Sequence, residues 1–598
     1  MKIALIQLPV NDPNNLYIEG NVFLAAGYLK ASINSVNKKY DISIIPDNIA
    51  KFGSDFSVIK WILDNNFEVV GFTNYMWNIE RHLFIVEKIK EVNKEIIVIF
   101  GGPEITSDFS NVNVDIIVVG EGEILFKKIL NDIEAKNFQK IYINTCLNNL
   151  EEVSNPYING ILDIHDNVSV FLETMRGCPY KCKYCFYSKD FSKVRYFSLD
   201  IVGEVLRIAN DKQAKEIYIM DPSFNVSKNF INKLKFIGKH NYNKIPLHTE
   251  MYLEAIDKEI ADLMQLAGFQ SIEAGLQSYN EKTLKAINRF FDEKKFLYGA
   301  NLLKERNIWP KLGVIIGLPF DTLDSFQRTL EFTIENDLYY YMEVYFLSIL
   351  PGTKLKDEAE LYRIEYMKKP PYYVLSSNGM SEYALFESIS IYENYTDFQY
   401  YPDIIPHFGN FDSEIISFID LTKQDVSLLD YLYDNQHKLS INLTILFKEK
   451  DIDSVVKFGN WLKRNDPNIM VKLVLDSNNK IDDNLFIRLS NAFFVSDHYL
   501  NRVYYFKQDN QNRFSTRVFH KTSNLEVISL YFSENRFADL VIDYKKGFYN
   551  QIKEYLPYYP IIYIDDKISV KEYENLINDY KESEEYIILS DSALKAFS

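Results

Sequence analysis

The sequence predicts an α/β protein of about three domains. Short apolar runs typical of buried strands alternate with helical stretches through most of the chain, which is the pattern of parallel βα units. A chain of 598 residues exceeds what one hydrophobic core supports. Hydrophobic residues make up 47% of it and charged residues 25%, the balance of a globular protein that can bury large cores.

Composition argues against several classes of protein. Only four cysteines occur, which argues against a disulfide framework and for a reducing compartment. The N-terminal stretch lacks the basic segment and long apolar run of a signal peptide, and no run of about 18 apolar residues follows. The net charge of −17 disfavours nucleic acid as a partner, because phosphate binding needs basic surface. We therefore expect a cytoplasmic protein with no membrane span.

Residues 1–140 predict a doubly wound domain, whose strand ends form a ligand crevice. Apolar strand-like runs alternate with helical stretches such as 21–33, 77–92 and 123–134; the runs are 2–10, 40–47, 68–75, 95–104 and 114–123. A nicotinamide cofactor is disfavoured. Gly120 and Gly122 form a G-x-G, but Leu125 stands where the third glycine belongs, and the glutamates at 121 and 123 would oppose a pyrophosphate.

The central region, 168–375, follows a connector at 141–167 that shows weak periodicity. Six strand-like runs alternate there with helical stretches, which indicates βα units with parallel pairing; they are 168–175, 215–221, 245–251, 269–278, 311–319 and 341–350. Chemistry in such folds collects at the carboxyl ends of the strands.

Residues 376–598 predict a C-terminal α/β or α+β domain. Helical stretches are expected at 453–466 and 569–583, and strands at 439–447, 469–476, 501–509, 523–532 and 560–566. No cofactor motif occurs in this region, and it contains no cysteine for a further metal cluster. A role in substrate recognition is possible for it.

Three cysteines, Cys178, Cys182 and Cys185, stand in a C-x3-C-x2-C spacing directly after the first strand of the central region. A structural zinc site normally has four protein ligands, and the fourth cysteine, Cys146, lies far upstream. Three thiolates on one loop can instead hold three irons of a [4Fe-4S] cluster and leave the fourth iron open. A zinc site completed by a distant residue, or plain buried thiols, are the alternatives.

The segments RGCPYKCKYC, IEAGLQSYNEKTLKAINR, GVIIGLPFDTLDSF and LPGTKL resemble the radical S-adenosylmethionine (SAM) superfamily. The resemblance implies a partial (βα)6 barrel, a [4Fe-4S] cluster on the three cysteines, and SAM. The resemblance also implies that Tyr184 lies near the adenine of SAM, and the coproporphyrinogen-oxidase-like branch of the superfamily implies SAM contacts from Glu250, Gln277 and Arg289. Two positions depart from that branch: Gly313 replaces an acidic residue, and Tyr252 stands where an arginine is frequent. For Glu250 and Arg289, the alternative to SAM binding is surface ion pairing.

The N-terminal domain resembles the Rossmann-like cobalamin-binding domain fused to many radical SAM enzymes, in the segments GNVFLAAGYLKA, VVGFTNYMWNI, FGGPEIT and DIIVVGEGE. The resemblance implies that loops after the strands hold cobalamin; their residues are Leu8, Pro9, Thr73, Asn74, Tyr75, Gly101, Gly102, Pro103, Gly120, Glu121 and Gly122. His82 does not stand in a D-x-H-x-x-G motif, so we expect no histidine ligand on cobalt. The alternative is a domain that keeps the fold and binds nothing.

Together these resemblances imply a cobalamin-dependent radical SAM methyltransferase that acts on an unactivated carbon of a peptide or small natural product. The route would use a 5′-deoxyadenosyl radical and methylcobalamin, with electrons from a donor such as flavodoxin or ferredoxin. A non-methylating cyclase, epimerase or rearrangement enzyme of the same build remains open, and a non-catalytic corrinoid or iron–sulfur sensor is a third reading. Methylthiolation of transfer RNA is disfavoured, because residues 1–140 contain no cysteine for a second cluster.

Overall fold

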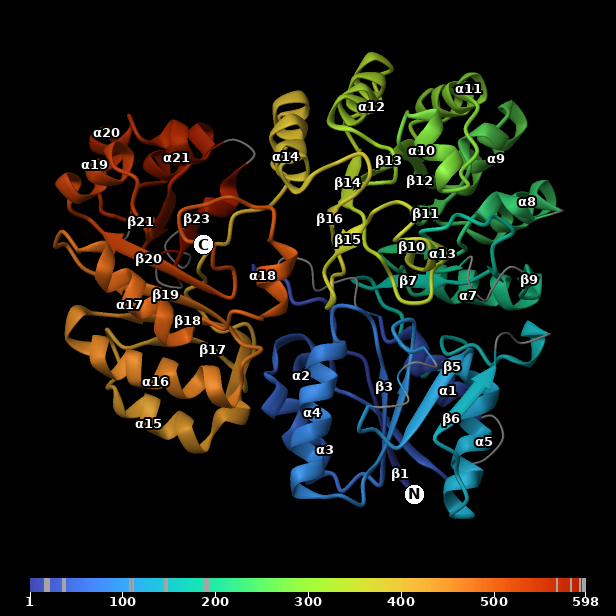
Figure 1. Ribbon diagram of the computed structural model, residues 1–598, viewed down its shortest axis with the longest axis horizontal. Coiled ribbons are helices and arrows are strands. Elements are labelled where there is room, and N and C mark those ends of the chain that lie inside the picture. The colour runs from blue at the N-terminus through green and yellow to red at the C-terminus, as the bar shows by residue number, and fades with distance from the viewer. Residues whose placement is uncertain are drawn as a thin grey trace.

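The computed structural model describes residues 1–14, 22–34, 39–106, 109, 112–144, 149–187, 193–227, 229–565, 568–580, 583–590 and 593. Three bodies make up the molecule (Figure 1): the N-terminal domain at lower right, a barrel-like domain above it and the C-terminal domain at left. Each contains one large parallel sheet. The α/β class expected from the alternating pattern is confirmed. Among the described residues, no helix combines the length and the apolar character needed to cross a membrane.

The N-terminal domain has a six-stranded parallel sheet in the order β2-β1-β3-β4-β5-β6. The strands are β1 (Lys2–Ile6), β2 (Asp41–Ile44), β3 (Val69–Thr73), β4 (Ile97–Gly101), β5 (Ile116–Gly120) and β6 (Ile141–Asn144). The helices α1 (Leu24–Asn34) and α5 (Gly122–Glu134) pack on one face, and α2 (Asp47–Phe52), α3 (Asp55–Asp64) and α4 (Ile79–Val92) pack on the other. The strand order reverses between β1 and β3, which is where doubly wound sheets open a ligand crevice.

The central domain is an open barrel of six parallel strands in the order β7-β10-β11-β12-β13-β14. All six strands expected from the sequence are present, as β7 (Ser169–Leu172), β10 (Glu216–Ile219), β11 (Leu247–Glu250), β12 (Phe269–Gln277), β13 (Trp309–Ile316) and β14 (Glu343–Phe346). Its helices are α7 (Leu199–Asp211), α8 (Phe230–His240), α9 (Lys258–Ala267), α10 (Glu281–Ala286), α11 (Glu293–Lys304), α12 (Leu323–Glu335) and α13 (Lys354–Asp357). Alternate residues of each strand face these helices or the barrel lumen.

The C-terminal domain has a seven-stranded parallel sheet in sequential order, so it is α/β rather than α+β. The strands are β17 (Ile416–Asp420), β18 (Leu439–Phe447), β19 (Met470–Asp476), β20 (Thr516–Thr522), β21 (Asp539–Tyr544), β22 (Ile561–Ile564) and β23 (Ile587–Leu589). The helices are α15 (Ser427–Asp434), α16 (Ile452–Asn465), α17 (Asp483–Phe493), α18 (Tyr499–Val503), α19 (Leu525–Ser533), α20 (Tyr549–Ile552) and α21 (Val570–Tyr580).

Two strands predicted in this domain are wrong. Residues 501–509 include the end of α18, and 523–532 form most of α19. Both runs are rich in β-branched and aromatic residues, but the helices at these places begin at capping side chains: His498 accepts from the Leu500 amide, and Asn524 accepts from the Glu526 amide. Capping and packing outweigh the weak strand propensity of these residues.

Two expected domain boundaries also differ from the structure. Residues 141–144, taken as the start of the connector, form β6 at the edge of the N-terminal sheet. Residues beyond 375 continue the central domain, because α14 (Glu382–Thr396) packs against α12 and apolar side chains as far as Ile404 join the barrel core. The C-terminal sheet begins only at Ile416. Cys146 lies outside the described residues.

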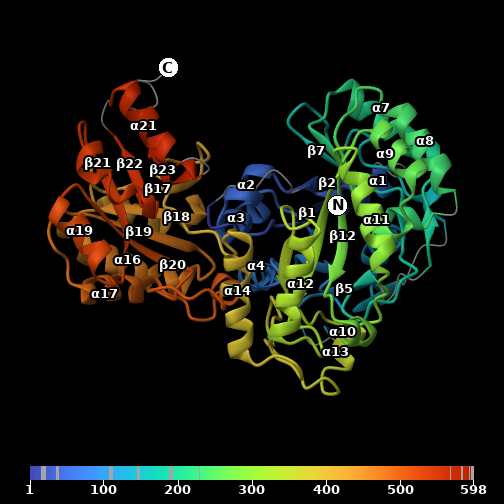
Figure 2. The same cartoon turned by 90° about the horizontal axis from the view of Figure 1, so that it is seen from above.

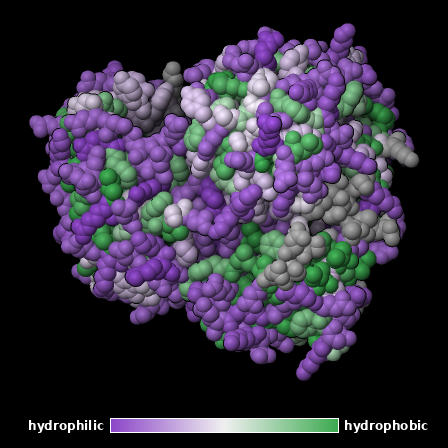
Figure 3. All heavy atoms as spheres, viewed as in Figure 1, coloured by the Kyte–Doolittle hydropathy of each residue, from purple (hydrophilic) through white to green (hydrophobic). Residues whose placement is uncertain are grey.

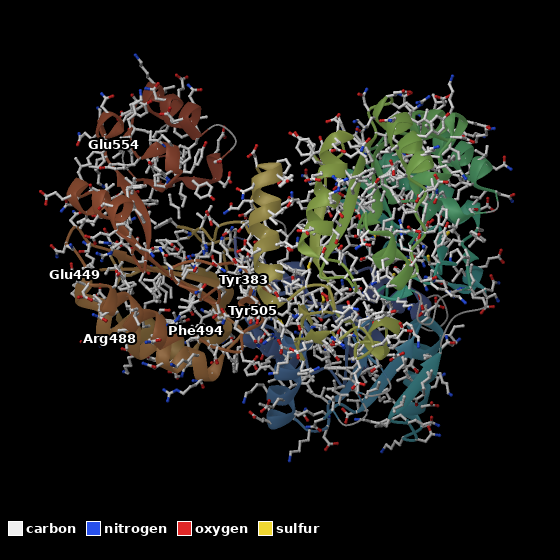
Figure 4. The ribbon with its side chains drawn as sticks, turned by 45° about the horizontal axis from the view of Figure 1, so that its top comes forward. Tyr383, Glu449, Arg488, Phe494, Tyr505 and Glu554 are labelled. Carbon is white, nitrogen blue, oxygen red and sulfur yellow. The ribbon has the colours of Figure 1, made fainter. Side chains whose placement is uncertain are left out.

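The C-terminal domain is fastened to both other domains. Seen from above, the C-terminal domain and the barrel lie on either side of α14 and the N-terminal helices (Figure 2). Tyr505, which faces α14 (Figure 4), donates to Glu382 at the start of that helix. The loop after β1 enters the C-terminal domain, where Lys472 donates to the Pro13 carbonyl and Asn442 donates to the Asp12 carbonyl at 2.8 Å.

Candidate functional site

The cysteine loop leaves the barrel at the carboxyl end of β7. A two-stranded ribbon closes its base, because β8 (Met175–Arg176) pairs antiparallel with β9 (Arg195–Tyr196). Asp221, at the end of β10, accepts hydrogen bonds from the Thr174 amide at 2.8 Å and the Met175 amide at 3.0 Å. This carboxylate braces the strand that leads into the loop.

The three cysteines converge on one loop, and none of them forms a disulfide bond. Cys178 and Cys182 are buried and Cys185 is half-buried, and the Cys185 amide donates to the Cys182 carbonyl at 3.1 Å. Burial and then the neighbouring Cys185 and Cys182 raise the pKa of Cys178 to about 11. No three His, Cys, Asp or Glu side chains among the described residues have the geometry of a single-ion site. Three thiols on one loop fit a [4Fe-4S] cluster, in which each thiolate binds a different iron.

The barrel lumen beside this loop holds a cavity of about 300 Å³. Three of the four residues expected to contact SAM line it, namely Tyr184, Glu250 and Gln277. Gly313 also lines it, so the position that lacks the family's acidic residue does face the cavity. Further charged and polar side chains complete the lining: Glu273, Lys311, Glu343 and Tyr345.

Glu250 is the carboxylate in this lumen best suited to hold an ammonium group. It ends β11, and its side chain lines the cavity. Desolvation within the lumen, and then the charge of Glu273, raise the pKa of Glu250 to about 7. A carboxylate whose negative charge is disfavoured in this way gains from a cationic partner, such as the amino group of SAM.

Arg289 and Gln277 meet at an irregularity in the barrel wall. The pairing of β12 with β13 shifts register between Gly275 and Gln277, and Gln277 has a φ of +68°. The Arg289 guanidinium donates to the Gly275 carbonyl and lies 4.0 Å from the centre of the Tyr252 ring. Bulges of this kind re-aim side chains next to active sites.

Tyr252, which departs from the family's arginine, contacts the cysteine loop. Its hydroxyl lies 4.0 Å from the Cys182 sulfur, and its ring lies 4.0 Å from the ring of Tyr180. Asn225 donates to its carbonyl at 2.8 Å. Tyr252 therefore fills the space between the loop and Arg289, a placement that the sequence signals only as a departure from the family.

A second cavity, of about 340 Å³, lies between the N-terminal domain and the barrel. Part of its lining is apolar, with Leu5 from β1, Leu29 from α1 and Ile129 from α5. Seven of the residues expected at cobalamin line it: Thr73, Tyr75, Gly101, Gly102, Gly120, Glu121 and Gly122. An apolar slot with a polar rim is the lining expected for part of a large organic cofactor. On the face seen in Figure 3, apolar residues gather where these two domains meet.

Glycine is required in this lining where the loops after β4 and β5 pass close to neighbours. Gly102 has a φ of +106°, and a Cβ there would lie 2.6 Å from the backbone of Asn74. A Cβ on Gly122 would lie 3.2 Å from the Leu29 side chain. The glycines present avoid these close contacts and line the cavity, so the residues present fit a bound cobalamin.

Four other residues expected at cobalamin do not line the cavity. Leu8 is fully buried, and its carbonyl accepts from the Asn78 side chain at 2.9 Å. Asn74 is buried beneath the rim and bonds His82 Nδ1 at 2.8 Å. The remaining two, Pro9 and Pro103, lie in the loops after β1 and β4. His82 is itself buried among α4 and β3, and burial lowers its pKa.

The sequence did not lead us to expect several of the residues that line the second cavity. The cobalamin-side cavity is also lined by Glu173, Arg176, Tyr187 and Met220, all from the barrel domain or its cysteine loop. Arg176 stands directly before the cysteine motif, and this adjacency is the one feature of the sequence that could have indicated its place. Glu121 and Glu123 pair with barrel arginines, so these two glutamates face the second domain as well as the cavity.

Comparison with known proteins agrees with this arrangement. The model of the Radical SAM superfamily matches residues 172–333, and that of the B12 binding domain matches residues 23–130. An uncharacterized methyltransferase, PH0819, of Pyrococcus horikoshii is 22% identical over 60% of this chain and 83% of its own length. The cobalamin-dependent radical SAM methyltransferase TokK of Streptomyces tokunonensis is 22% identical over 54% of this chain, which spans only 53% of TokK.

Solved structures share the fold. The radical SAM methyltransferase TsrM from Kitasatospora setae superimposes with a TM-score of 0.52 at 14% identity, over 66% of this chain and 89% of its own. OxsB, solved with aqua-cobalamin and SAM, gives 0.53 at 16% identity, over 65% of this chain and 66% of its own. The cofactors implied are thus a [4Fe-4S] cluster, SAM and cobalamin. This chain therefore carries a radical SAM domain, with a B12-binding domain ahead of it.

Proposed function

We propose that this enzyme methylates an unactivated carbon of a peptide or small natural product. One observation carries the proposal: the cysteine loop borders both cavities. Tyr184 on this loop lines the SAM cavity, and Tyr187, three residues later, lines the cavity expected to hold cobalamin. A substrate between the two would be within reach of both cofactors, which is what a methyl transfer after hydrogen abstraction requires.

The residues divide the work by cofactor. Cys178, Cys182 and Cys185 would hold the cluster, which supplies the electron for SAM cleavage and leaves one iron open to SAM. Glu250 would pair with the SAM amino group, and Arg289 with its carboxylate. Cobalamin would serve as the methyl carrier. The chain's own part is to bind, orient and exclude water, and no protein acid or base is assigned.

The relatives support methylation over the alternatives. TokK is named a cobalamin-dependent radical SAM methyltransferase, and a further relative at 22% identity is named 2-(S-pantetheinyl)-carbapenam-3-carboxylate methyltransferase. The second of these names gives a small-molecule substrate, which supports a small natural product as the acceptor here. An electron donor such as flavodoxin or ferredoxin completes the proposal, because SAM cleavage consumes an electron.

The experiment that tests this function counts the products of SAM. The reconstituted enzyme, supplied with a reductant, methyl-labelled SAM and its acceptor, should release 5′-deoxyadenosine and S-adenosylhomocysteine in about equal amounts, because one SAM is cleaved and another donates its methyl group. Label should appear on the acceptor. Product formed with 5′-deoxyadenosine but without S-adenosylhomocysteine would support the non-methylating cyclase, epimerase or rearrangement enzyme instead.

A further inference from the structure

Five charged side chains join the N-terminal domain to the base of the cysteine loop. Glu121 and Glu123 come from the start of α5, and Glu173, Arg176 and Arg195 come from the barrel domain. We call these five residues the interdomain ion network. They lie between the cobalamin-side cavity and the loop, and all but Arg195 line that cavity.

Arg195 and Glu121 form a two-point pair between the two domains. Arg195 Nη1 donates to Glu121 Oε2 at 2.7 Å, and Arg195 Nη2 donates to Glu121 Oε1 at 2.8 Å. The side chain of Arg195 is 4% exposed and that of Glu121 is 7% exposed. A planar, two-point pair that is shielded from water fixes orientation as well as distance.

Arg176 forms the second contact across the same boundary. Its Nη1 donates to Glu123 Oε1 at 2.7 Å, and its Nε and Nη2 each donate to the Glu173 carboxylate at 2.9 Å. The guanidinium also lies 5.2 Å from the centre of the Tyr28 ring on α1. Arg176 is therefore held from the N-terminal domain by both a carboxylate and an aromatic ring.

The pairing of β8 with β9 brings these two contacts together. Arg176 on β8 and Arg195 on β9 are direct partners in the antiparallel register. Between them the chain runs through all three cysteines, so the two arginines form the neck of the cysteine loop. Glutamates of the B12-binding domain thus hold both strands of that neck. Domains in one chain ordinarily move relative to each other unless the interface restrains them.

We propose that the interdomain ion network is a set of positioning residues that fixes the cysteine loop against the cobalamin-side cavity. This inference rests on the proposed function, because it gives the network a purpose only where SAM and cobalamin must meet. Without it, the cluster and SAM sites remain complete, but their distance from the cobalamin side is no longer fixed. Methyl transfer from SAM to cobalamin should then fail while SAM cleavage persists.

The test uses full-length protein with Arg195→Gln, Glu121→Gln and the double variant. Arg195→Lys keeps the charge but not the two-point geometry, and guards against a variant that does not fold. Arg207→Gln is the matched control, because Arg207 also makes a two-point pair, with Glu204 at 2.9 and 2.7 Å, but on the exposed surface of α7. Arg207 is not part of either cavity.

The first readout is hydrogen exchange in the cofactor-free protein. In Arg195→Gln, amides of residues 175–187 and 193–196 and of the first turns of α5 should exchange faster than in the wild type, whereas Arg207→Gln should change neither. The double variant should perturb exchange less than the two single variants together, because it leaves no unpaired buried charge. Unchanged exchange in both regions would contradict the proposal.

The second readout separates two half-reactions of reconstituted enzyme with hydroxocobalamin, reductant and labelled SAM. Iron content and 5′-deoxyadenosine formation should stay near wild type in Arg195→Gln, while transfer of label to cobalamin should fall by about 10- to 100-fold, as for small misplacements of reacting groups. Transfer of label in Arg195→Lys should lie between that of the wild type and that of Arg195→Gln. The proposal would be overturned if Arg195→Gln lost the cluster as well as the transfer of label, or if it transferred label as well as the wild type does. Failure of the wild type to load label would instead defeat the proposed function.

Discussion

Glu250 shows how the barrel lumen prepares one carboxylate for a cation. Because desolvation and Glu273 raise its pKa to about 7, the side chain is close to half protonated near neutral pH. SAM brings an ammonium group that pairs only with the carboxylate. In the proposed site, where Glu250 holds this group, binding of SAM is therefore linked to loss of a proton from Glu250.

This linkage predicts a pH dependence with a definite sign. The dissociation constant for SAM should rise as pH falls below 7, approaching about tenfold per pH unit, and should level off above 7 where the carboxylate is already charged. Glu250→Gln should bind SAM weakly and lose this dependence. Calorimetric titrations from about pH 6 to about pH 8 measure it. An unchanged slope in the variant would rule out Glu250 as the responsible group.

The cysteines give a second prediction at this scale. Alanine at Cys178, Cys182 or Cys185 should abolish the cluster, since each removes one of three thiolates on the loop. Cys146→Ala should leave about four irons and four sulfides per chain. Iron and sulfide analysis after anaerobic reconstitution provides the measurement. Zinc as the tightly bound metal, or cluster loss on changing Cys146, would contradict the assignment.

The sequence located these residues because their spacing is local or because they end strands. Cys178, Cys182 and Cys185 lie within one loop, and Glu250 and Gln277 close β11 and β12. The partner of Glu121 could not be found in this way. Arg195 is far along the chain and meets Glu121 only because β8 and β9 pair beside the start of α5.

At the scale of elements, loops after parallel strands build both cavities. In the loop after β4, a Cβ on Gly102 would lie 2.6 Å from the backbone of Asn74 in the loop after β3. This loop contributes the rim of the cobalamin-side cavity. Its conformation therefore matters for binding even though it supplies no side chain.

Gly102→Ala should destabilise this loop and weaken cobalamin binding. The left-handed φ of +106° costs about 1 to 3 kcal/mol for a non-glycine residue, and the contact of 2.6 Å with Asn74 adds to it. Gly160→Ala is the control, because Gly160 also has a positive φ, of +63°, but has nothing within 4 Å. Thermal unfolding and hydroxocobalamin titration measure both effects. Equal losses of thermal stability and of cobalamin affinity in the two variants would show that the contact with Asn74 is unimportant.

The strand pattern predicted most elements, since βα units repeat the same apolar signal. It failed at 501–509 and 523–532, where Tyr, Phe, Ile and Leu sit on short helices that pack between domains or on the C-terminal sheet. It also missed β17, β20, β21 and β23. Sequence periodicity cannot separate short buried helices from strands.

At the scale of the molecule, the C-terminal domain braces the loop after β1. Lys472 on β19 is fully buried and donates to the Pro13 carbonyl of that loop. Burial lowers the pKa of Lys472 to about 7. An amine that is hard to charge in the folded state, but freely charged in the unfolded state, opposes folding fully below pH 7 and progressively less as the pH rises towards its ordinary pKa.

The resulting prediction concerns stability at alkaline pH. Because the unfolded state binds more protons than the folded state above pH 7, the free energy of unfolding should rise from pH 7 towards about pH 10, by at most about 1.4 kcal/mol per unit from this group. Lys472→Met should remove this contribution. Denaturant titrations of the two proteins give the difference; parallel pH profiles would show that Lys472 does not titrate in this window.

The domain arrangement itself was only partly predictable. The sequence distinguished three bodies, but placed the second boundary near 375, because the helix α14 and the segment up to Ile404 have no strand partner to mark them. Their membership of the barrel core comes from packing against α12, a contact between distant residues. Such contacts are tertiary, and no local pattern records them.

The central claim is that the SAM site of the barrel and the cavity of the N-terminal domain work as one site. It is tested most directly by incubating the reconstituted, reduced enzyme and hydroxocobalamin with methyl-labelled SAM, then analysing the bound cobalamin. Our account predicts one labelled methyl group on cobalamin for each S-adenosylhomocysteine released. A protein that retains its cluster and cleaves SAM, yet neither holds cobalamin nor transfers label to it, would contradict the account.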